Sequence, residues 1–349
     1  MDNKIRKPII SRDFNFNQKV IFVDGQPGCG KTMLSSILSS LKNVELNTFL
    51  FELEFICRLY YLKKIDEDAV NSLIKMLVDF KLYNSMMGRE VNFRYSDISS
   101  AFNDPNALRY FKRIFQSGDE TIPAKIKKTK PILNIASHDL LGMSEPIFKS
   151  LGDKVTILEV IRHPLYMLIQ QTLNFERLQN NPRDVQINIS YNNKELPYYT
   201  YGWEELFLDS NSVERAIYTM NHCINFTQKA KNFPLKKYKD QVITIPFENF
   251  VLNPDQYVNK ITEAIGVKHT RITKKTMKKQ KVPRRKISDG IPLKIYKRCG
   301  WVPPDRKLTE KEELEKRREF AFKSNASSKS LKVLDALCKQ YESKIWRPE

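Results

Sequence analysis

Long apolar runs are missing from this 349-residue sequence: no stretch is long enough to cross a bilayer, and Met1–Ile10 lacks the apolar core of a signal peptide. Cysteine is scarce as well, with five residues that are scattered and lack the paired spacing of a metal site. We therefore expect reduced thiols, a cytoplasmic protein and no metal centre. The cysteines are Cys29, Cys57, Cys223, Cys299 and Cys338.

Acidic residues are outnumbered by basic ones, which gives a formal net charge of +19. The excess is concentrated in the run Lys268–Lys286, which holds ten Lys or Arg residues and no acid. Such a run can bind an anionic small molecule or polymer, or it can simply be a solvated face. We do not expect specific nucleic-acid binding, because the run contains no aromatic residue and the chain shows no known nucleic-acid-binding motif.

A glycine-rich segment near the amino end, Gly25–Thr32, fits the phosphate-loop pattern G-x-x-x-x-G-K-[ST] at every fixed position. It follows the apolar run Val20–Val23 and precedes apolar residues at helical spacing, so strand, glycine turn and helix occur in order. Backbone N–H groups of such a loop can enclose an anion, and the helix N-terminus favours negative charge. We call Gly25–Thr32 the glycine loop. Its predicted phosphate-binding residues are Gly25, Gly28, Cys29, Gly30, Lys31 and Thr32.

Strand-like and helical segments alternate along the rest of the chain, which predicts an α/β fold with a mostly parallel central sheet, helices on both faces and further helices at the carboxyl end. We expect a polar lead-in at 1–18, one domain at 19–300 with an insertion or lid at 176–212, and a helical extension at 301–349 packed on the same domain. Expected strands are Val20–Val23, part of Phe49–Leu62, Pro131–Ala136, Val155–Ile161 and Gln241–Ile245. Expected helices are Asp66–Met87, Asp104–Ser117, Val213–Lys231, Pro254–Ile265, Leu308–Phe322 and Ser330–Trp346.

Ligands of open parallel sheets bind beyond the carboxyl ends of the strands. If the strand assignments hold, the glycine loop, Ser137–Asp139, Arg162–Pro164 and Phe247–Asn249 line one edge of the sheet. A phosphate loop, a histidine and an arginine are therefore expected to converge there.

The order of these motifs resembles the P-loop sulfotransferases, which use 3′-phosphoadenosine 5′-phosphosulfate. "NIASHDLL" presents His138 where the family has its catalytic His, and "VIRHPLYMLIQ" presents Arg162 where the family binds the 3′-phosphate. "VITIPFENFVLNP" and "VPRRKISDG" resemble two later family segments, and the second of these returns to the 3′-phosphate in the family. The resemblance runs from about Val20 to Gly290. It implies sulfuryl transfer to an acceptor hydroxyl. From the basic surface and the polar lid alone, our default interpretation is that this acceptor is a glycan or another hydroxyl compound of the cell envelope.

The glycine loop departs from the family pattern. Gly28 stands where the family has Lys or Arg, and Lys31 where it has Thr or Ser, which gives the loop the GKT of nucleotide kinases. Gln170 falls at the position of the family's 3′-phosphate Ser and can still donate a hydrogen bond. Lys31 would then neutralise the leaving phosphate, the task of the family's Lys at the Gly28 position.

The remaining candidate residues are His138, Asp139 and five basic residues. His138 is the expected general base, with Asp139 beside it as a residue that could orient the ring, although strand neighbours usually point apart. The resemblance assigns the second nucleotide contact to Arg285 and Lys286, with Arg284 as an almost equal choice. Arg89 and Arg94 are candidates for binding an acidic acceptor.

Two other functions remain open. An ATP- and Mg²⁺-dependent kinase would use Lys31 and Thr32 directly, but Glu159 and Asp24 are poorly placed as its metal-binding acid. A non-catalytic nucleotide- or polyanion-binding protein could use the same loop.

Overall fold

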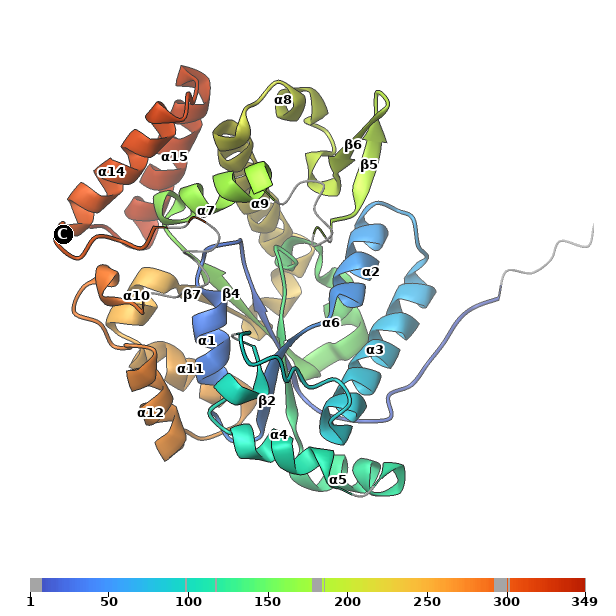
Figure 1. The fold of residues 1–349 in the computed structure, drawn as a ribbon. Coiled ribbons are helices and arrows are strands. Elements are labelled where there is room, and N and C mark those ends of the chain that lie inside the picture. The colour runs from blue at the N-terminus through green and yellow to red at the C-terminus, as the bar shows by residue number, and fades with distance from the viewer. Residues whose placement is uncertain are drawn as a thin grey trace, which may run out of the picture.

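The computed structural model describes residues 8–97, 99–116, 118–177, 184, 186–291, 300 and 302–348. Three features predicted from the sequence lie wholly or partly outside the described residues: Cys299, residues 178–183 and 185 of the expected lid, and the expected domain boundary at 300/301. Within it, a five-stranded sheet is surrounded by helices (Figure 1). The predicted α/β fold is confirmed.

The strands of the main sheet are ordered β2-β3-β1-β4-β7, and every neighbouring pair is parallel. β1 lies at the centre, with Val20 opposite Leu133 on one side and Val155 on the other. The carboxyl ends of all five strands therefore meet at one edge, where the glycine loop leaves β1. The strands are β1 (Val20–Asp24), β2 (Val44–Phe49), β3 (Ile132–Ala136), β4 (Val155–Ile161) and β7 (Val242–Pro246).

Successive residues of β1 point into two different cores. Ile21 and Val23 pack with α1, α7, α9, α11 and α15, whereas Val20 and Phe22 pack with α2, α3, α5 and α6. This alternation is what a fully buried strand requires when helices cover both faces of a sheet. The helices are α1 (Lys31–Leu38), α2 (Phe51–Tyr61), α3 (Glu67–Met87), α4 (Ala107–Ile114), α5 (Ile122–Thr129), α6 (Glu145–Leu151), α7 (Pro164–Arg177), α8 (Glu204–Leu208), α9 (Ser212–Asn232), α10 (Phe247–Leu252), α11 (Asp255–Ile265), α12 (Arg271–Lys279), α14 (Glu310–Lys323) and α15 (Ser328–Lys344).

The strand expected within Phe49–Leu62 was misplaced. β2 ends at Phe49, and Phe51–Tyr61 is helix α2. The strand itself, Val44–Phe49, contains a buried glutamate, Glu45, which is bound by Arg113 at 2.7 Å. Because its charge is compensated from α4, a polar residue is accommodated in a buried strand.

The expected lid is more regular than its polar composition indicates. It contains an antiparallel hairpin of β5 (Asn188–Tyr191) and β6 (Lys194–Pro197), followed by α8. Asn192 and Asn193 form its turn with φ values of 46° and 60°, a conformation that asparagine tolerates well.

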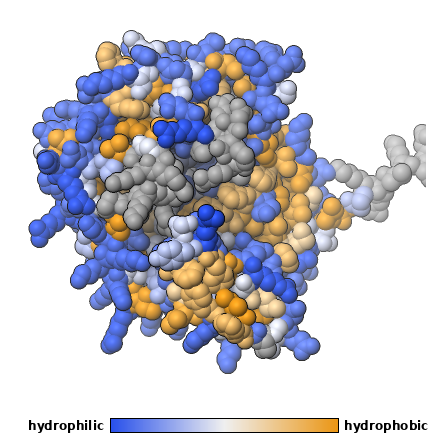
Figure 2. All heavy atoms as spheres, in the orientation of Figure 1, coloured by the Kyte–Doolittle hydropathy of each residue, from blue (hydrophilic) through white to orange (hydrophobic). Residues whose placement is uncertain are grey.

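Two outlying segments pack on this body. Before β1, the backbone N–H of Asn15 donates to Asp79 of α3 at 2.7 Å. At the carboxyl end, α14 and α15 pack on α7, and α15 also packs on α9. No helix of the described residues has the length and apolar character needed to cross a membrane. Figure 2 shows apolar side chains gathered over α4, where Phe102, Leu108 and Ile114 are exposed.

Candidate functional site

The glycine loop connects β1 to α1 at the carboxyl edge of the sheet. Gly25, Gly28 and Gly30 have φ values of 142°, 88° and 106°, which lie in the region that favours glycine. Space is restricted too: a Cβ at Gly25 would lie 2.3 Å from the carbonyl oxygen of Val160, and one at Gly30 would lie 2.3 Å from Cδ2 of Phe247. The backbone path of the loop therefore depends on its glycines.

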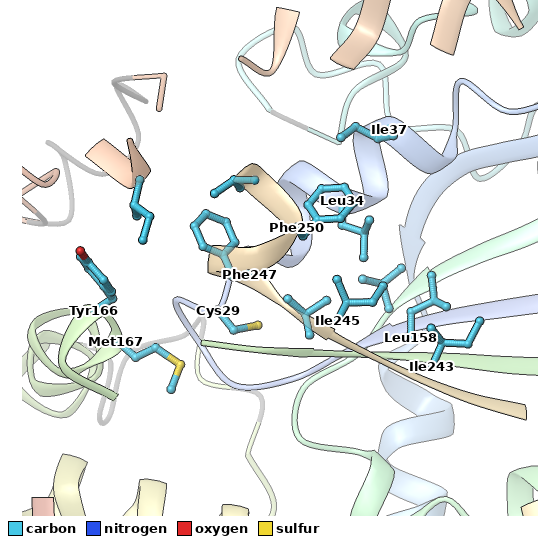
Figure 3. Packing of buried hydrophobic residues seen from close by; sticks show 14 of the residues in the cluster. Cys29, Leu34, Ile37, Leu158, Tyr166, Met167, Ile243, Ile245, Phe247 and Phe250 are labelled. Atoms are coloured by element: carbon cyan, nitrogen blue, oxygen red, sulfur yellow. The ribbon is translucent and has the colours of Figure 1, made fainter. Parts of the chain in front are cut away.

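Lys31 folds back over the loop that precedes it. Its Nζ donates to the carbonyl oxygen of Gly25 and, at 3.1 Å, to that of Gln26. Thr32 is exposed beside it, whereas Cys29 is buried and burial raises the pKa of its thiol. In Figure 3, Cys29 lies between Phe247 and Met167, in the core below the loop. Cys29 is thus a packing residue, and the loop offers Lys31, Thr32 and backbone N–H groups to a ligand.

Arg162 reaches the loop from the end of β4. Its Nη1 donates to the carbonyl oxygen of Gly28 at 2.9 Å, and its guanidinium lies over the rings of Phe247 and Tyr166, 4.1 and 4.9 Å from their centroids. Its Nε is buried without a hydrogen-bond partner in the described part of the chain. The contact with Glu248 is long, at 3.9 Å from Nε. Arg162 therefore retains hydrogen-bonding capacity and charge for a ligand.

Gln170, from α7, approaches the same glycine. A Cβ at Gly28 would lie 3.0 Å from Oε1 of Gln170 and 3.5 Å from Cα of Met167. A lysine or arginine at this position would need the Gln170 side chain to move. Gly28 and Gln170, two positions at which the sequence departs from the family pattern, are therefore neighbours in the structure.

Of the three basic residues in the "RRK" segment, Arg284 faces the loop region. It lies 5.5 Å from the centroid of Phe247, and its Nη1 donates to the carbonyl oxygen of Ile287 at 3.0 Å. Burial and, next, the neighbouring charge of Arg162 together lower the pKa of Arg284 to about 10. Arg285 and Lys286 are exposed. Their expected role at the nucleotide stays a prediction, and the position of Arg284 favours the alternative.

The sequence reasoning missed a third arginine, Arg317. It lies in α14, which was expected to be a mostly surface helix, yet it is 2% exposed and lies 5.0 Å from the centroid of Tyr166. Its Nε donates to Glu313 at 2.7 Å. Burial lowers the pKa of Arg317, and Arg162 contributes in the same direction. The sequence pattern E-x-x-x-R, formed by Glu313 and Arg317, indicated this ion pair within α14. Nothing in the sequence indicated that Arg317 lies next to Tyr166.

One buried carboxylate holds the backbone next to Arg162. Glu248 is fully buried and accepts hydrogen bonds from the backbone N–H of His163 at 3.1 Å and from the hydroxyl of Tyr341 at 2.6 Å. The imidazole of His163 contacts Glu342 at 3.0 Å. α15 thus fixes the backbone that carries Arg162.

His138 follows β3 at the same edge. Its Nδ1 lies 3.2 Å from Oε1 of Glu54, whose other oxygen accepts from Arg58 at 2.8 Å. The imidazole stacks on Phe49 and Phe51 with centroid distances of 5.7 and 6.0 Å. A carboxylate on Nδ1 leaves Nε2 available for a proton. The role of His138 as a base stays a prediction.

A cavity of about 240 Å³ lies next to the start of the glycine loop, between β4, α9 and α15. Asp24 and Gly25 line it from β1, and Asp139 lines it from the loop after β3. Asp24 is fully engaged: it accepts from Ser137 Oγ at 2.8 Å and from the backbone N–H groups of Leu140 and Leu141 at 3.0 and 2.9 Å. Asp24 therefore ties the loop after β3 to the end of β1.

Glu159, the other acid weighed for a kinase, also lines the cavity. It accepts from Lys231 at 2.7 Å and from Thr244 at 2.5 Å. Neither acid is free to take a ligand without losing these partners. Among the residues that the structure describes, no group of three His, Cys, Asp or Glu side chains could hold a metal ion.

Arg89 and Arg94 lie away from this edge. Arg89 is close to the carboxyl end of α3, where Gly88 packs on Arg113, and Arg113 binds the start of β2. Arg89 pairs with Asp119 at 3.4 Å and Arg94 with Asp97 at 3.5 Å, with both arginines more than half exposed. The structure brings neither of them to the glycine loop.

The basic run Lys268–Lys286 forms α12 and the turn after it. α12 packs on α1, with Thr273 Oγ1 donating to the carbonyl oxygen of Ser40 at 3.2 Å and Gln280 Nε2 to Ser36 Oγ at 3.1 Å. Its lysines face outward. The run thus places positive charge on the surface beside the helix that follows the glycine loop.

No protein-family model and no curated protein matches this chain. Among solved structures, similarity is found to a sulfotransferase domain of the Synechococcus PCC 7002 olefin synthase, with 12% identity, a TM-score of 0.42, and coverage of 95% of this chain and 98% of that one. Sulfotransferase STF9 from Mycobacterium avium gives 12% identity and a TM-score of 0.41 over 97% of this chain and 78% of that one. A sulfotransferase domain from the curacin biosynthetic pathway gives 12% identity and a TM-score of 0.39 over 82% and 99%. These similarities are too distant to establish a family, donor or substrate.

Proposed function

We propose that this protein transfers a sulfuryl group from 3′-phosphoadenosine 5′-phosphosulfate to an acceptor hydroxyl. The observation that carries the proposal is the presence of two cationic positions around the glycine loop, at the carboxyl edge of the sheet. Lys31 and the glycine loop form the first, and Arg162 with Arg284 forms the second. A donor that carries phosphate at both its 5′ and 3′ positions would occupy both, whereas ATP has a single phosphate chain and needs only the first.

The second position has the properties of an anion site. Burial and Arg162 lower the pKa of Arg284, and the buried Nε of Arg162 has no hydrogen-bond partner among the described residues. Two nearby guanidinium groups are stabilised by an anion between them, and each can bind phosphate through two hydrogen bonds. Gln170, beside Gly28, adds a side-chain amide. We assign the 3′-phosphate to this position.

At the first position, backbone N–H groups of the glycine loop would hold the 5′-phosphosulfate. Charge accumulates on the bridging phosphate oxygen as the sulfuryl group leaves, and Lys31 is placed to neutralise it. Lys31 must release the carbonyl oxygens of Gly25 and Gln26 to do so. The acceptor hydroxyl also needs a base, and two side chains at the end of β3 qualify, His138 and Asp139.

Ligand-induced thermal stabilisation tests the proposal. With 3′,5′-ADP at about 100 times its dissociation constant, the folded state should gain about 2.7 kcal/mol. 5′-AMP, which lacks the 3′-phosphate, should give a much smaller shift. Stabilisation by ATP with Mg²⁺ but not by 3′,5′-ADP would overturn the proposal in favour of a kinase. Binding only to heparin, with loss at high salt, would indicate a polyanion-binding protein.

Variants of the basic residues test which of them binds the 3′-phosphate. Arg284→Gln should weaken 3′,5′-ADP about 10- to 100-fold, the worth of a charge-assisted hydrogen bond, and leave 5′-AMP unchanged. Arg285→Gln tests the alternative from the sequence and should have a smaller effect. The control is Arg271→Gln, which removes the same charge from an exposed position of α12.

A further inference from the structure

The carboxylate of Asp139 lies beside the start of the glycine loop. No hydrogen bond or ion pair joins the Asp139 side chain to any residue that the structure describes. Its neighbour His138 is held by Glu54 and by the stacked rings of Phe49 and Phe51. An unpaired carboxylate in a mostly enclosed position is costly unless it serves a ligand.

Asp139 also lines two cavities, as Cys223 and Thr227 do. It lines the 240 Å³ cavity beside Gly25 and a smaller one beneath Tyr198 and Tyr199, whereas His138 lines neither. Its backbone has a φ of 51°, an uncommon conformation for a residue with a side chain. Such strain persists where the surrounding structure enforces it, often at functional sites.

The other charged residues that line the larger cavity are Asp24, Glu159, Arg162, Lys231 and Lys344, and Arg162 is assigned above to the 3′-phosphate. Glu159 is bound by Lys231, and Asp24 by its three donors. Thr227 and Gln228 of α9 add hydrogen-bonding groups to walls that are otherwise largely apolar. Next to Asp139, an anionic acceptor group would lie against the charges of Asp139 and Asp24. A neutral alcohol or single sugar unit fits this lining.

We propose that this cavity is the acceptor site, and that Asp139 rather than His138 receives the proton of a neutral acceptor hydroxyl. The inference rests on the proposed sulfuryl transfer. As the acceptor oxygen forms its bond to sulfur, its proton passes to a carboxylate oxygen of Asp139. The bond between sulfur and the bridging phosphate oxygen breaks, and its electron pair remains on 3′,5′-ADP. The protonated Asp139 then returns its proton to water.

The charges around Asp139 suit this task. The pKa of Asp139 is raised to about 7, first by burial and then by Asp24, while Lys31 and Arg58 oppose the rise. A base with a pKa near the working pH is close to optimal for proton transfer. The titratable or charged groups that face Asp139 from the surrounding elements are Asp24, Cys29, Lys31, Glu54, Arg58, Tyr198, Tyr199 and Cys223.

A pair of probes separates a base from a structural residue. p-Nitrobenzyl alcohol must lose a proton during transfer, whereas p-nitrophenol at about pH 8.5 is largely ionised already and needs no base. Release of 3′,5′-ADP from the donor is followed with each. Asp139→Asn should lower turnover of the alcohol at least about 100-fold and that of the phenol only a few-fold. Asparagine tolerates the backbone conformation, so the variant should fold.

The pH profile and a matched variant complete the test. Wild-type turnover of the alcohol should rise with pH through about 7, and this rise should vanish in Asp139→Asn but persist in His138→Gln. Ile224→Trp, which fills the cavity wall, should impair both probes while 3′,5′-ADP still stabilises the protein. The inference would be overturned if Asp139→Asn kept full activity with the alcohol, or if the pH rise were lost in His138→Gln instead. It would also be overturned if the wild type bound 3′,5′-ADP but turned over neither probe. Failure of wild type to bind 3′,5′-ADP would instead reject the proposed function.

Discussion

A single methyl group at Gly30 should disturb both the glycine loop and the arginines behind it. In Gly30→Ala, the new Cβ would lie 2.3 Å from Cδ2 and 2.5 Å from Cε2 of Phe247. The ring would have to move by about 1 Å to reach van der Waals contact. That ring carries the guanidinium of Arg162 at 4.1 Å and that of Arg284 at 5.5 Å.

The expected loss of stability has two parts. Forcing alanine to a φ of 106° costs about 1–3 kcal/mol, and overpacking against Phe247 costs a similar amount, about 1–3 kcal/mol. Gly30→Ala should therefore lower the free energy of unfolding by about 2–6 kcal/mol in urea denaturation. Gly118→Ala is the control, because a Cβ at Gly118 meets no atom within 4 Å.

A double-mutant cycle isolates the clash. Phe247→Leu alone should cost about 1.5 kcal/mol or less, and in its presence the overpacking part of Gly30→Ala should largely disappear. The coupling free energy should be about 1–3 kcal/mol. Additivity within about 0.5 kcal/mol, or a Gly30→Ala variant as stable as wild type, would refute the packing described for this loop.

Two further predictions concern buried carboxylates. Tyr341→Phe removes the hydroxyl that donates to Glu248 and should cost about 1.5–3 kcal/mol in urea denaturation, whereas Tyr201→Phe, at an exposed position, should cost less than about 0.5 kcal/mol. Arg113→Met should cost about 3–5 kcal/mol at neutral pH, because Glu45 would remain buried without its partner. Burial raises the pKa of Glu45, but Arg113 outweighs it and leaves that pKa below its ordinary value. The pair therefore stabilises the fold above the ordinary glutamate pKa, and this contribution is lost as pH falls through the folded-state pKa. The difference in free energy of unfolding between Arg113→Met and wild type should therefore become smaller in acid. A difference that does not depend on pH would contradict this.

The sequence predicted the strands whose residues are mostly apolar. Val155–Ile161 was predicted to the residue, because a β-branched run between polar segments has few other structures available. The strand at Val44–Phe49 was missed because it contains the polar residues Glu45 and Asn47, and Arg113, the partner that allows Glu45 to be buried, lies 68 positions away in the sequence. Phe51–Tyr61 resembled a strand because its aromatic and β-branched residues suit either structure.

The candidate site shows the same limit. The pattern of the glycine loop located Lys31 and Thr32, and the rule on strand ends located Arg162 and His138 at one edge of the sheet. Which way neighbouring side chains point could not be predicted. Arg284 rather than Arg285 meets Phe247, and Asp139 rather than His138 faces the cavity, because of local backbone geometry and packing that sequence spacing does not encode.

The support that α15 gives to Arg162 has a consequence for biosynthesis. Gly28 is made early, but Tyr341 and Glu342, which hold Glu248 and His163, are made more than 300 residues later. While translation proceeds, the glycine loop can form with β1 and α1, yet the arginine opposite it lacks its final support. A ribosome-bound chain that still has α15 in the exit tunnel should therefore be unable to retain nucleotide, and binding competence should arise only after α15 has emerged.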